Sequence, residues 1–174
     1  MPEKKLHTLC ESHFFDLFFR KHVEDLRNFL FYKFGNLDTA ADLAQEAFVK
    51  LWDNCDKVDT DRAKNYLFTI GVNLGISQKR HEQVKFKYQE IKIHSKEDRT
   101  HESPEFILEE KQFEAKLMKC IAELPDRQRE VFLLHRMEKK TYKEIAEMSQ
   151  VSVKAIEKLM TKALKKLREN IDQL

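Results

Sequence analysis

The chain has only three glycines and three prolines among its 174 residues, and this scarcity limits its possible folds more than any other feature. Tight β-turns depend heavily on these two residues, whereas the good helix formers Leu, Lys, Glu, Ala and Gln occur throughout the sequence. Apolar residues also recur at helical spacing along most of the chain. We therefore expect an all-α fold made of two small helical domains joined by a flexible linker.

The first expected domain covers residues 10–90 and contains three helices. Its first helix carries a dense run of aromatic and aliphatic residues and stops at Gly35-Asn36. Asp38 is placed to cap the second helix, and a third helix runs from about Thr60 to a basic run that ends at His81. The second helix has Leu43, Ala47, Phe48 and Leu51 on one side.

Residues 91–108 form the expected linker, because the stretch from His94 to Pro104 has no apolar residue and cannot bury enough surface to order itself. The second expected domain covers residues 109–172. Within it, Pro125 ends one helix, and Asp126 is placed to cap the next.

A helix-turn-helix is expected from Thr141 onward. Thr141 and Glu144 have the spacing of a capping box, Gln150 lies in the turn, and Ser152 is placed to cap the last helix. That helix is expected to bury Ile156, Leu159, Ala163, Leu164 and Leu167, and to expose Lys154, Lys158, Lys162 and Lys165.

Charge is concentrated on this last helix, although the net charge of the whole chain is only +2. Residues 152–168 hold six basic residues and one acidic residue. A helix with this pattern can lie in the major groove of DNA, with its N-terminal polar residues at base edges and its lysines at phosphates. The alternative is a solvated face on an ordinary helical hairpin, but the coincidence of cap, small central residue, short turn and basic stripe favours DNA binding.

Three segments together resemble one family. These are Asp42-x-x-Gln45-Glu46-x-Phe48-x-x-x-Trp52, the stretch from Ala63 to Arg80 with Asn73 within it, and Leu124-Pro125-Asp126-Arg127-Gln128-Arg129-Glu130-Val131-Phe132. With the helix-turn-helix that follows, they are similar to bacterial RNA polymerase sigma factors of the extracytoplasmic-function (ECF) group of the sigma-70 family. The resemblance covers about residues 12–170.

The resemblance implies that the chain binds core RNA polymerase and directs promoter-specific initiation. The first domain would recognise and melt the minus-ten element, binding its single strand, and the second would bind the double-stranded minus-thirty-five element. An anti-sigma factor is a further implied partner. The residues that match the family's functional positions are Asp42, Gln45, Glu46 and Lys50 for polymerase, Asn73, Lys79 and Arg80 for the minus-ten element, and Lys154, Glu157, Lys158, Thr161, Lys162 and Lys165 for the minus-thirty-five element.

Some of these residues have a second interpretation. Asn73 is equally suited to a structural hydrogen bond, and Glu157 either accepts from a cytosine amino group or pairs with a neighbouring lysine. Phe48 and Trp52 are expected in the core, and so is Tyr66, which has helical spacing with Asn73.

Two other functions are compatible with the sequence. One is a helix-turn-helix regulator that binds operators without polymerase, and the other is a helical adaptor whose lysine face is only solvated. No catalytic, metal-binding or phosphate-binding motif occurs, so we expect no enzyme activity, no cofactor and no small-molecule substrate. Three widely spaced cysteines argue against a disulfide framework, and no apolar run is long enough to span a membrane, so we expect a cytoplasmic protein.

Overall fold

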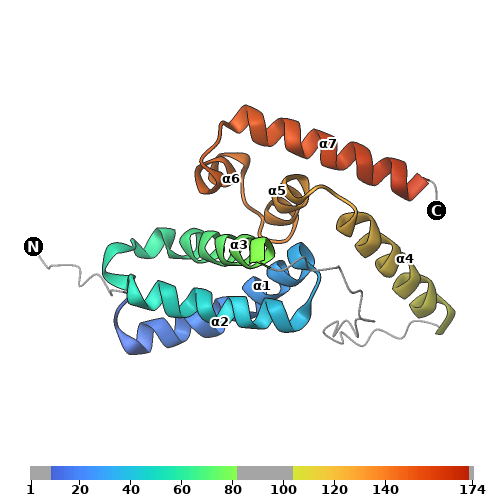
Figure 1. Cartoon of the computed structure of the whole chain (residues 1–174). Helices are drawn as coiled ribbons and strands as arrows, with labels where there is room; N and C mark the ends of the chain where they lie inside the picture. The colour runs from blue at the N-terminus through green and yellow to red at the C-terminus, as the bar shows by residue number, and fades with distance from the viewer. Residues whose placement is uncertain (1–8, 82–103, 173–174) are drawn as a thin grey trace, which may run out of the picture.

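The computed structural model describes residues 9–81 and 104–172, and every regular element in these two ranges is helical (Figure 1). This confirms the all-α prediction. The first range holds α1 (Ser12–Phe34), α2 (Leu37–Asp53) and α3 (Ala63–His81), with the short 3₁₀ helices η1 (Cys55–Lys57) and η2 (Thr60–Arg62) before α3. The second range holds α4 (Pro104–Ala122), α5 (Asp126–Arg136), α6 (Tyr142–Ser149) and α7 (Val153–Asp172).

Helices α1 and α2 form an antiparallel hairpin around a turn at Gly35. Gly35 adopts a left-handed backbone with φ 81°, which glycine tolerates well, and its N–H donates to the carbonyl of Phe31 at 2.7 Å. The prediction that Asp38 caps α2 is wrong: the Asn36 Oδ1 accepts from the Thr39 N–H at 2.8 Å, and Asp38 lies in the first turn. The cap is Asn36 because α2 starts earlier, at Leu37.

Helix α3 packs against this hairpin through an unusually close approach at Gly75. A Cβ on Gly75 would lie 2.2 Å from two ring carbons of Phe34, so the ring rests directly on the α3 backbone. Deeper in the same domain, the rings of Phe29 and Phe68 lie 5.3 Å apart, and both side chains are fully buried. The aromatic run of α1 therefore builds the core of the first domain.

Cys10 and Cys55 are joined by a disulfide, which corrects the expectation from the sequence. The hairpin explains the pairing. Phe15 contacts Trp52 and Phe19 contacts Phe48, so in the same antiparallel register the residues before α1 reach those after α2. The separation of 45 residues in the sequence concealed this proximity. The third cysteine, Cys120, is free and buried.

Helix α4 starts at Pro104, within the predicted linker, so the last residues of that stretch are helical. Proline is favourable at the first position of a helix, since its missing N–H would have no helical partner there. The rest of the predicted linker, residues 91–103, lies outside the described residues. Asp126 is also not a cap: the cap position is Pro125, and Asp126 is the first residue of α5.

The last helix buries Ile156, Met160, Ala163 and Leu167, and Leu159 is half-buried. The prediction for Leu164 is wrong, since this side chain is 38% exposed and Met160 is buried instead. An apolar stripe at 156, 160, 163 and 167 follows the helical repeat on one face, and Leu164 lies beside that stripe.

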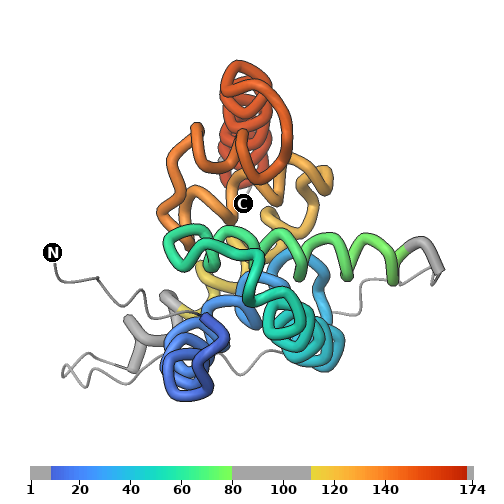
Figure 2. Tube along the Cα trace, turned by 90° about the vertical axis from the view of Figure 1, so that its left-hand side faces the viewer, coloured from blue at the N-terminus to red at the C-terminus, as the bar shows by residue number. Residues whose placement is uncertain are grey.

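The two domains pack against each other, with α5 and α6 next to α1 and α3 (Figures 1 and 2). Lys33 of α1, with a side chain only 4% exposed, forms an ion pair with Glu130 of α5 at 2.8 Å. Arg129 donates through Nη1 to the backbone carbonyl of Lys33 at 2.8 Å, and Lys64 of α3 pairs with Glu138 at 2.9 Å. Polar, specific contacts therefore hold this arrangement.

No helix among residues 9–81 and 104–172 has the length and apolar character needed to cross a lipid bilayer.

Candidate nucleic-acid interface

The outer face of α7 carries the first candidate surface, which we call the α7 basic face: Lys154, Glu157, Lys158, Thr161, Lys162 and Lys165. All six side chains are exposed, as the helical spacing predicted. Thr161 donates to the carbonyl of Glu157 at 2.8 Å, and Lys165 lies 3.8 Å from Glu169. In the described part of the chain, no ion pair engages Lys154, Lys158 or Lys162, so their charges are available to an anionic partner.

Helix α6 and the turn after it lead into α7. At the start of α6, Thr141 and Glu144 form the predicted capping box: the Glu144 N–H donates to Thr141 Oγ1 at 3.2 Å, and the Thr141 N–H donates to Glu144 at 2.8 Å. The hydrogen bond from the Thr141 backbone lowers the pKa of Glu144. Gln150 takes a left-handed backbone with φ 54°, as its place in the turn requires.

Contacts after the turn complete the helix-turn-helix. The Ser152 Oγ accepts from the Ala155 N–H at 3.2 Å, which confirms Ser152 as the side chain that caps the start of α7. Ala146, at the centre of α6, is 4% exposed and lets α7 approach closely. The first turns of α7 are thereby packed against α6, with their polar side chains exposed.

A second candidate surface lies on α3. Asn73 is exposed, which fits contact with a ligand better than a buried structural hydrogen bond. Tyr66 is 39% exposed, so the expectation that it lies in the core is wrong. Tyr66 and Asn73 are seven residues apart and share one face of α3, because seven residues make nearly two helical turns. The sequence revealed the spacing but not which face α1 and α2 would cover.

The basic end of α3 is engaged in the domain contact. Lys79 Nζ lies 3.6 Å from Asp126 of α5 and 5.3 Å from the centre of the Phe34 ring. Arg80 lies in the last turn of α3. Asp126, predicted to be a helix cap, thus contacts one of the predicted DNA-binding residues instead.

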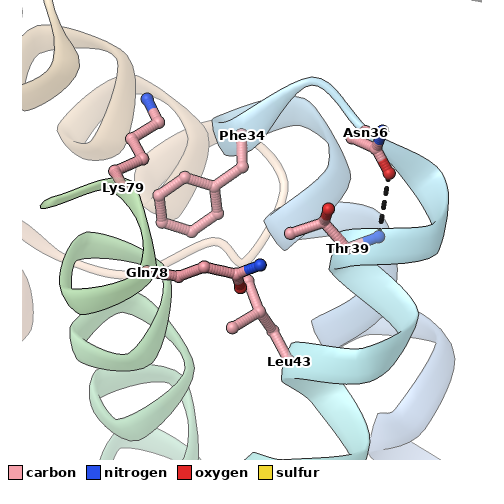
Figure 3. A pocket seen from close by; sticks show the side chains of 7 residues that line it. Phe34, Asn36, Thr39, Leu43, Gln78 and Lys79 are labelled. Carbon is pink, nitrogen blue, oxygen red and sulfur yellow. Dashed lines mark hydrogen bonds between the residues drawn. The ribbon is translucent and has the colours of Figure 1, made fainter. Parts of the chain in front are cut away.

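A small hollow lies beside Lys79, between the turn joining α1 to α2 and the last turns of α3 (Figure 3). Phe34 and Lys79 lie on one side of it, and Thr39 and Leu43 of α2 lie on the other. Its volume is about 10 Å³, which is room for about one water molecule. The hollow is therefore a packing feature and not a ligand site.

A third candidate surface is the polar side of α2, which we call the α2 polar face: Asp42, Gln45, Glu46 and Lys50. All four side chains are exposed, and Glu46 pairs with Lys50 at 3.4 Å across one helical turn. Phe48 is buried as predicted, but Trp52 is 40% exposed and Val49 is 58% exposed. Apolar surface therefore borders the charged face, which is typical of a protein interface.

The two helices that carry these faces lie in different parts of the molecule, with α2 in the lower half of Figure 1 and α7 at the top. Helix α2 packs on α1 and α3, whereas α7 packs on α4, α5 and α6. The structure thus brings Tyr66 and Asn73 together on α3 and keeps the α2 polar face and the α7 basic face apart.

Residues 18–84 match the family described as Sigma-70 region 2, and residues 114–167 match Sigma-70, region 4. The chain belongs to the sigma-70 family of RNA polymerase sigma factors. Its curated relatives include the RNA polymerase sigma factor YlaC of Bacillus subtilis (strain 168), 27% identical over 88% of this chain and 89% of the relative. Another relative in that organism is the ECF RNA polymerase sigma factor SigW, 26% identical over 80% of this chain and 79% of the relative.

The fold of this sigma factor resembles that of the sigma factor RpoE from Bartonella quintana, solved in complex with the anti-sigma factor NepR. The two share 22% identity at a TM-score of 0.71, over 91% of this chain and 96% of the other. These findings confirm the ECF group and the function predicted from the resemblance. The protein binds core RNA polymerase and directs promoter-specific initiation, and its family is regulatory and not catalytic.

Proposed function

We propose that this sigma factor holds core polymerase through the α2 polar face, contacts the minus-ten element through α3, and places the α7 basic face in the major groove of the minus-thirty-five element. The observation that carries the proposal is the α7 basic face itself, since its six exposed side chains lie on a helix whose start is capped by Ser152. Lysines that are not engaged in ion pairs can neutralise phosphates, and the N-terminal side chains of such a helix reach base edges.

Helix α3 would serve the minus-ten element through Asn73, Lys79 and Arg80. To these we add Tyr66, because an exposed aromatic ring on the same face as Asn73 can stack on an unpaired base of the melted strand. Asn73 can both donate to and accept from the edge of such a base. Lys79 would reach phosphate only after leaving Asp126, whose side chain is largely exposed.

The α2 polar face would bind polymerase by charge and hydrogen bonds at its centre and by the exposed Trp52 and Val49 beside them. We also propose a cytoplasmic location, where polymerase and DNA lie, and control by an anti-sigma factor, because RpoE was solved with one. The domain ranges 10–90, 91–108 and 109–172 stay our working division, with α4 extending the last domain to Pro104. We propose no catalytic activity and no small-molecule substrate.

The first test is transcription of genomic DNA fragments by core polymerase with and without the protein, followed by sequencing of the transcript ends. We expect new start sites that share two upstream elements. Replacing Asp42 and Glu46 by Lys should weaken polymerase binding at least about tenfold without changing helix content, because the charge at an exposed interface is reversed. A matched control reverses Asp16 and Glu24, which are exposed on α1.

The same assay separates the alternatives. In the variant Lys158→Glu with Lys162→Glu, the new start sites should be lost while polymerase binding stays intact. An operator-binding regulator would give no new start sites and would bind specific DNA alone. An adaptor would keep its partner and show no dependence on promoter DNA at all. Unchanged polymerase binding by the Asp42 and Glu46 variant would show that α2 is not the contact helix.

A further inference from the structure

Cys10 and Cys55 form a disulfide, and the function proposed above gives neither cysteine a role. The Cα atoms are 5.2 Å apart, and both side chains are half-buried. Leu9, next to Cys10, is only 1% exposed and packs into the core. The bond therefore joins an anchored segment before α1 to the first residue of η1.

The bond links the segment before α1 to the segment after α2, the two helices of the hairpin that bears the α2 polar face. On one side, α1 begins without a side-chain cap from Glu11. On the other side, α2 ends at Asp53, and the Nδ2 of the next residue, Asn54, donates to the carbonyl of Lys50 at 2.8 Å. Between the two, the Phe15 ring lies 4.8 Å from the Trp52 ring. The disulfide therefore closes the open end of the hairpin, opposite the turn at Gly35.

Whether this disulfide is permanent or reversible depends on the compartment of the protein, which rests on the function proposed above. A sigma factor works beside polymerase and DNA, in a compartment where thiols are kept reduced. Disulfides there are rare, and those that form are usually transient or redox-sensing. Since both cysteine side chains are only half-buried, small thiols and disulfides can exchange with the pair.

We propose that Cys10 and Cys55 are a reversible thiol–disulfide pair that strengthens the polymerase-binding hairpin when oxidised and so raises initiation under oxidising conditions. The oxidant is a low-molecular-weight disulfide. One cysteine thiolate attacks it, forming a mixed disulfide and releasing one thiolate. The other cysteine thiolate then attacks the sulfur of the first cysteine, which forms the Cys10–Cys55 bond and releases the second half of the oxidant as a thiolate. Two protein thiols lose two electrons and two protons, and the oxidant becomes two thiols.

Oxidation should stabilise the hairpin, because the bond closes a loop that contains all of α1 and α2. Such a cross-link removes conformational freedom from the unfolded chain. Reduction would let the first turn of α1 and the segment after α2 separate from each other. The Phe15–Trp52 contact, next to the α2 polar face, would loosen first.

The test uses the full chain, oxidised with glutathione disulfide or reduced with dithiothreitol and then freed of reagent. Mass spectrometry should show the loss of two hydrogens and a Cys10–Cys55 peptide pair in the oxidised sample. Its unfolding midpoint should be higher by at least about 5 °C. Just below the midpoint of the reduced form, the oxidised form should give at least about threefold more promoter-dependent transcript with core polymerase.

Cys10→Ser and Cys55→Ser should each abolish both differences, whereas Cys120→Ala should keep them, because Cys120 is buried and unpaired. Failure of the bond to form, an unchanged midpoint, or equal or lower initiation by the oxidised protein would overturn the proposal. A complete lack of promoter-dependent transcripts in both states would instead overturn the sigma-factor assignment and with it the link to initiation. The unfolding midpoint, which needs no polymerase, would still decide whether the disulfide strengthens the fold.

Discussion

His22 is a buried polar residue with several charged side chains near it. It lies on α1, is 8% exposed, and its ring stands 4.6 Å from the Phe18 ring. Burial lowers the pKa of His22 to about 4, helped by the nearby cations Lys64 and Lys21 and opposed by Asp25. The folded protein therefore holds this imidazole in its neutral form.

We expect the stability of the protein to depend on pH through this residue. The folded pKa of about 4 is below the ordinary value of 6.5, so the unfolded chain takes up the proton first as the pH falls. The contribution of His22 to the free energy of unfolding is fully present above about pH 6.5. As the pH falls from there to about 4, this free energy decreases by about 2–3 kcal/mol. Urea unfolding of the wild type and of His22→Phe at several pH values measures it. A similar pH dependence in both proteins over this range would contradict the assignment.

At the scale of elements, the packing of α3 on α1 depends on two glycines that meet different neighbours. A Cβ on Gly75 would lie 2.2 Å from the Phe34 ring, whereas a Cβ on Gly71 would lie 3.2 Å from the end of the Leu26 side chain. Phe34 is 5% exposed and held between α3 and the turn, while a leucine methyl can shift by a few tenths of an ångström.

Gly75→Ala should destabilise the protein by about 1–3 kcal/mol, because the ring has to move out of a packed site. Gly71→Ala is the matched control, with the same added methyl group in the same helix. It should change the free energy of unfolding by less than about 1 kcal/mol, since alanine also favours the helix. Denaturant unfolding gives both values. Equal effects would show that the contact with Phe34 is not what requires glycine at position 75.

At the scale of the whole molecule, the ion pair between Lys33 and Glu130 is a buried part of the domain contact. Lys33 is almost fully buried and is neutralised by Glu130, which is itself 19% exposed at its side chain. Arg129 of α5 donates across the contact to the carbonyl of Lys33, and within its own domain it donates to the carbonyls of Ile121 and Leu124. Neither the α2 polar face nor the α7 basic face takes part in this contact, so separation of the domains would leave both faces unchanged.

Glu130→Ala should open the two domains. It leaves the Lys33 ammonium buried without its carboxylate, at a cost of about 3–5 kcal/mol, which exposure to water would relieve. We expect the radius of gyration from small-angle X-ray scattering to rise while the helix content from circular dichroism stays constant. Replacing Lys33 by Met together with Glu130 by Leu should restore the closed form. A closed Glu130→Ala variant would mean that other contacts dominate the interface.

The sequence by itself determined the helical fold, the capping box at Thr141, the strained backbone at Gln150 and the apolar stripe of α7 apart from Leu164. These features depend on local propensity and helical periodicity, which neighbouring residues carry. Only the tertiary structure decided that Tyr66 is exposed, that Cys10 meets Cys55, and that Lys33 is buried against Glu130. Each of these depends on which helix faces cover one another, and that is settled by packing between residues far apart in the chain.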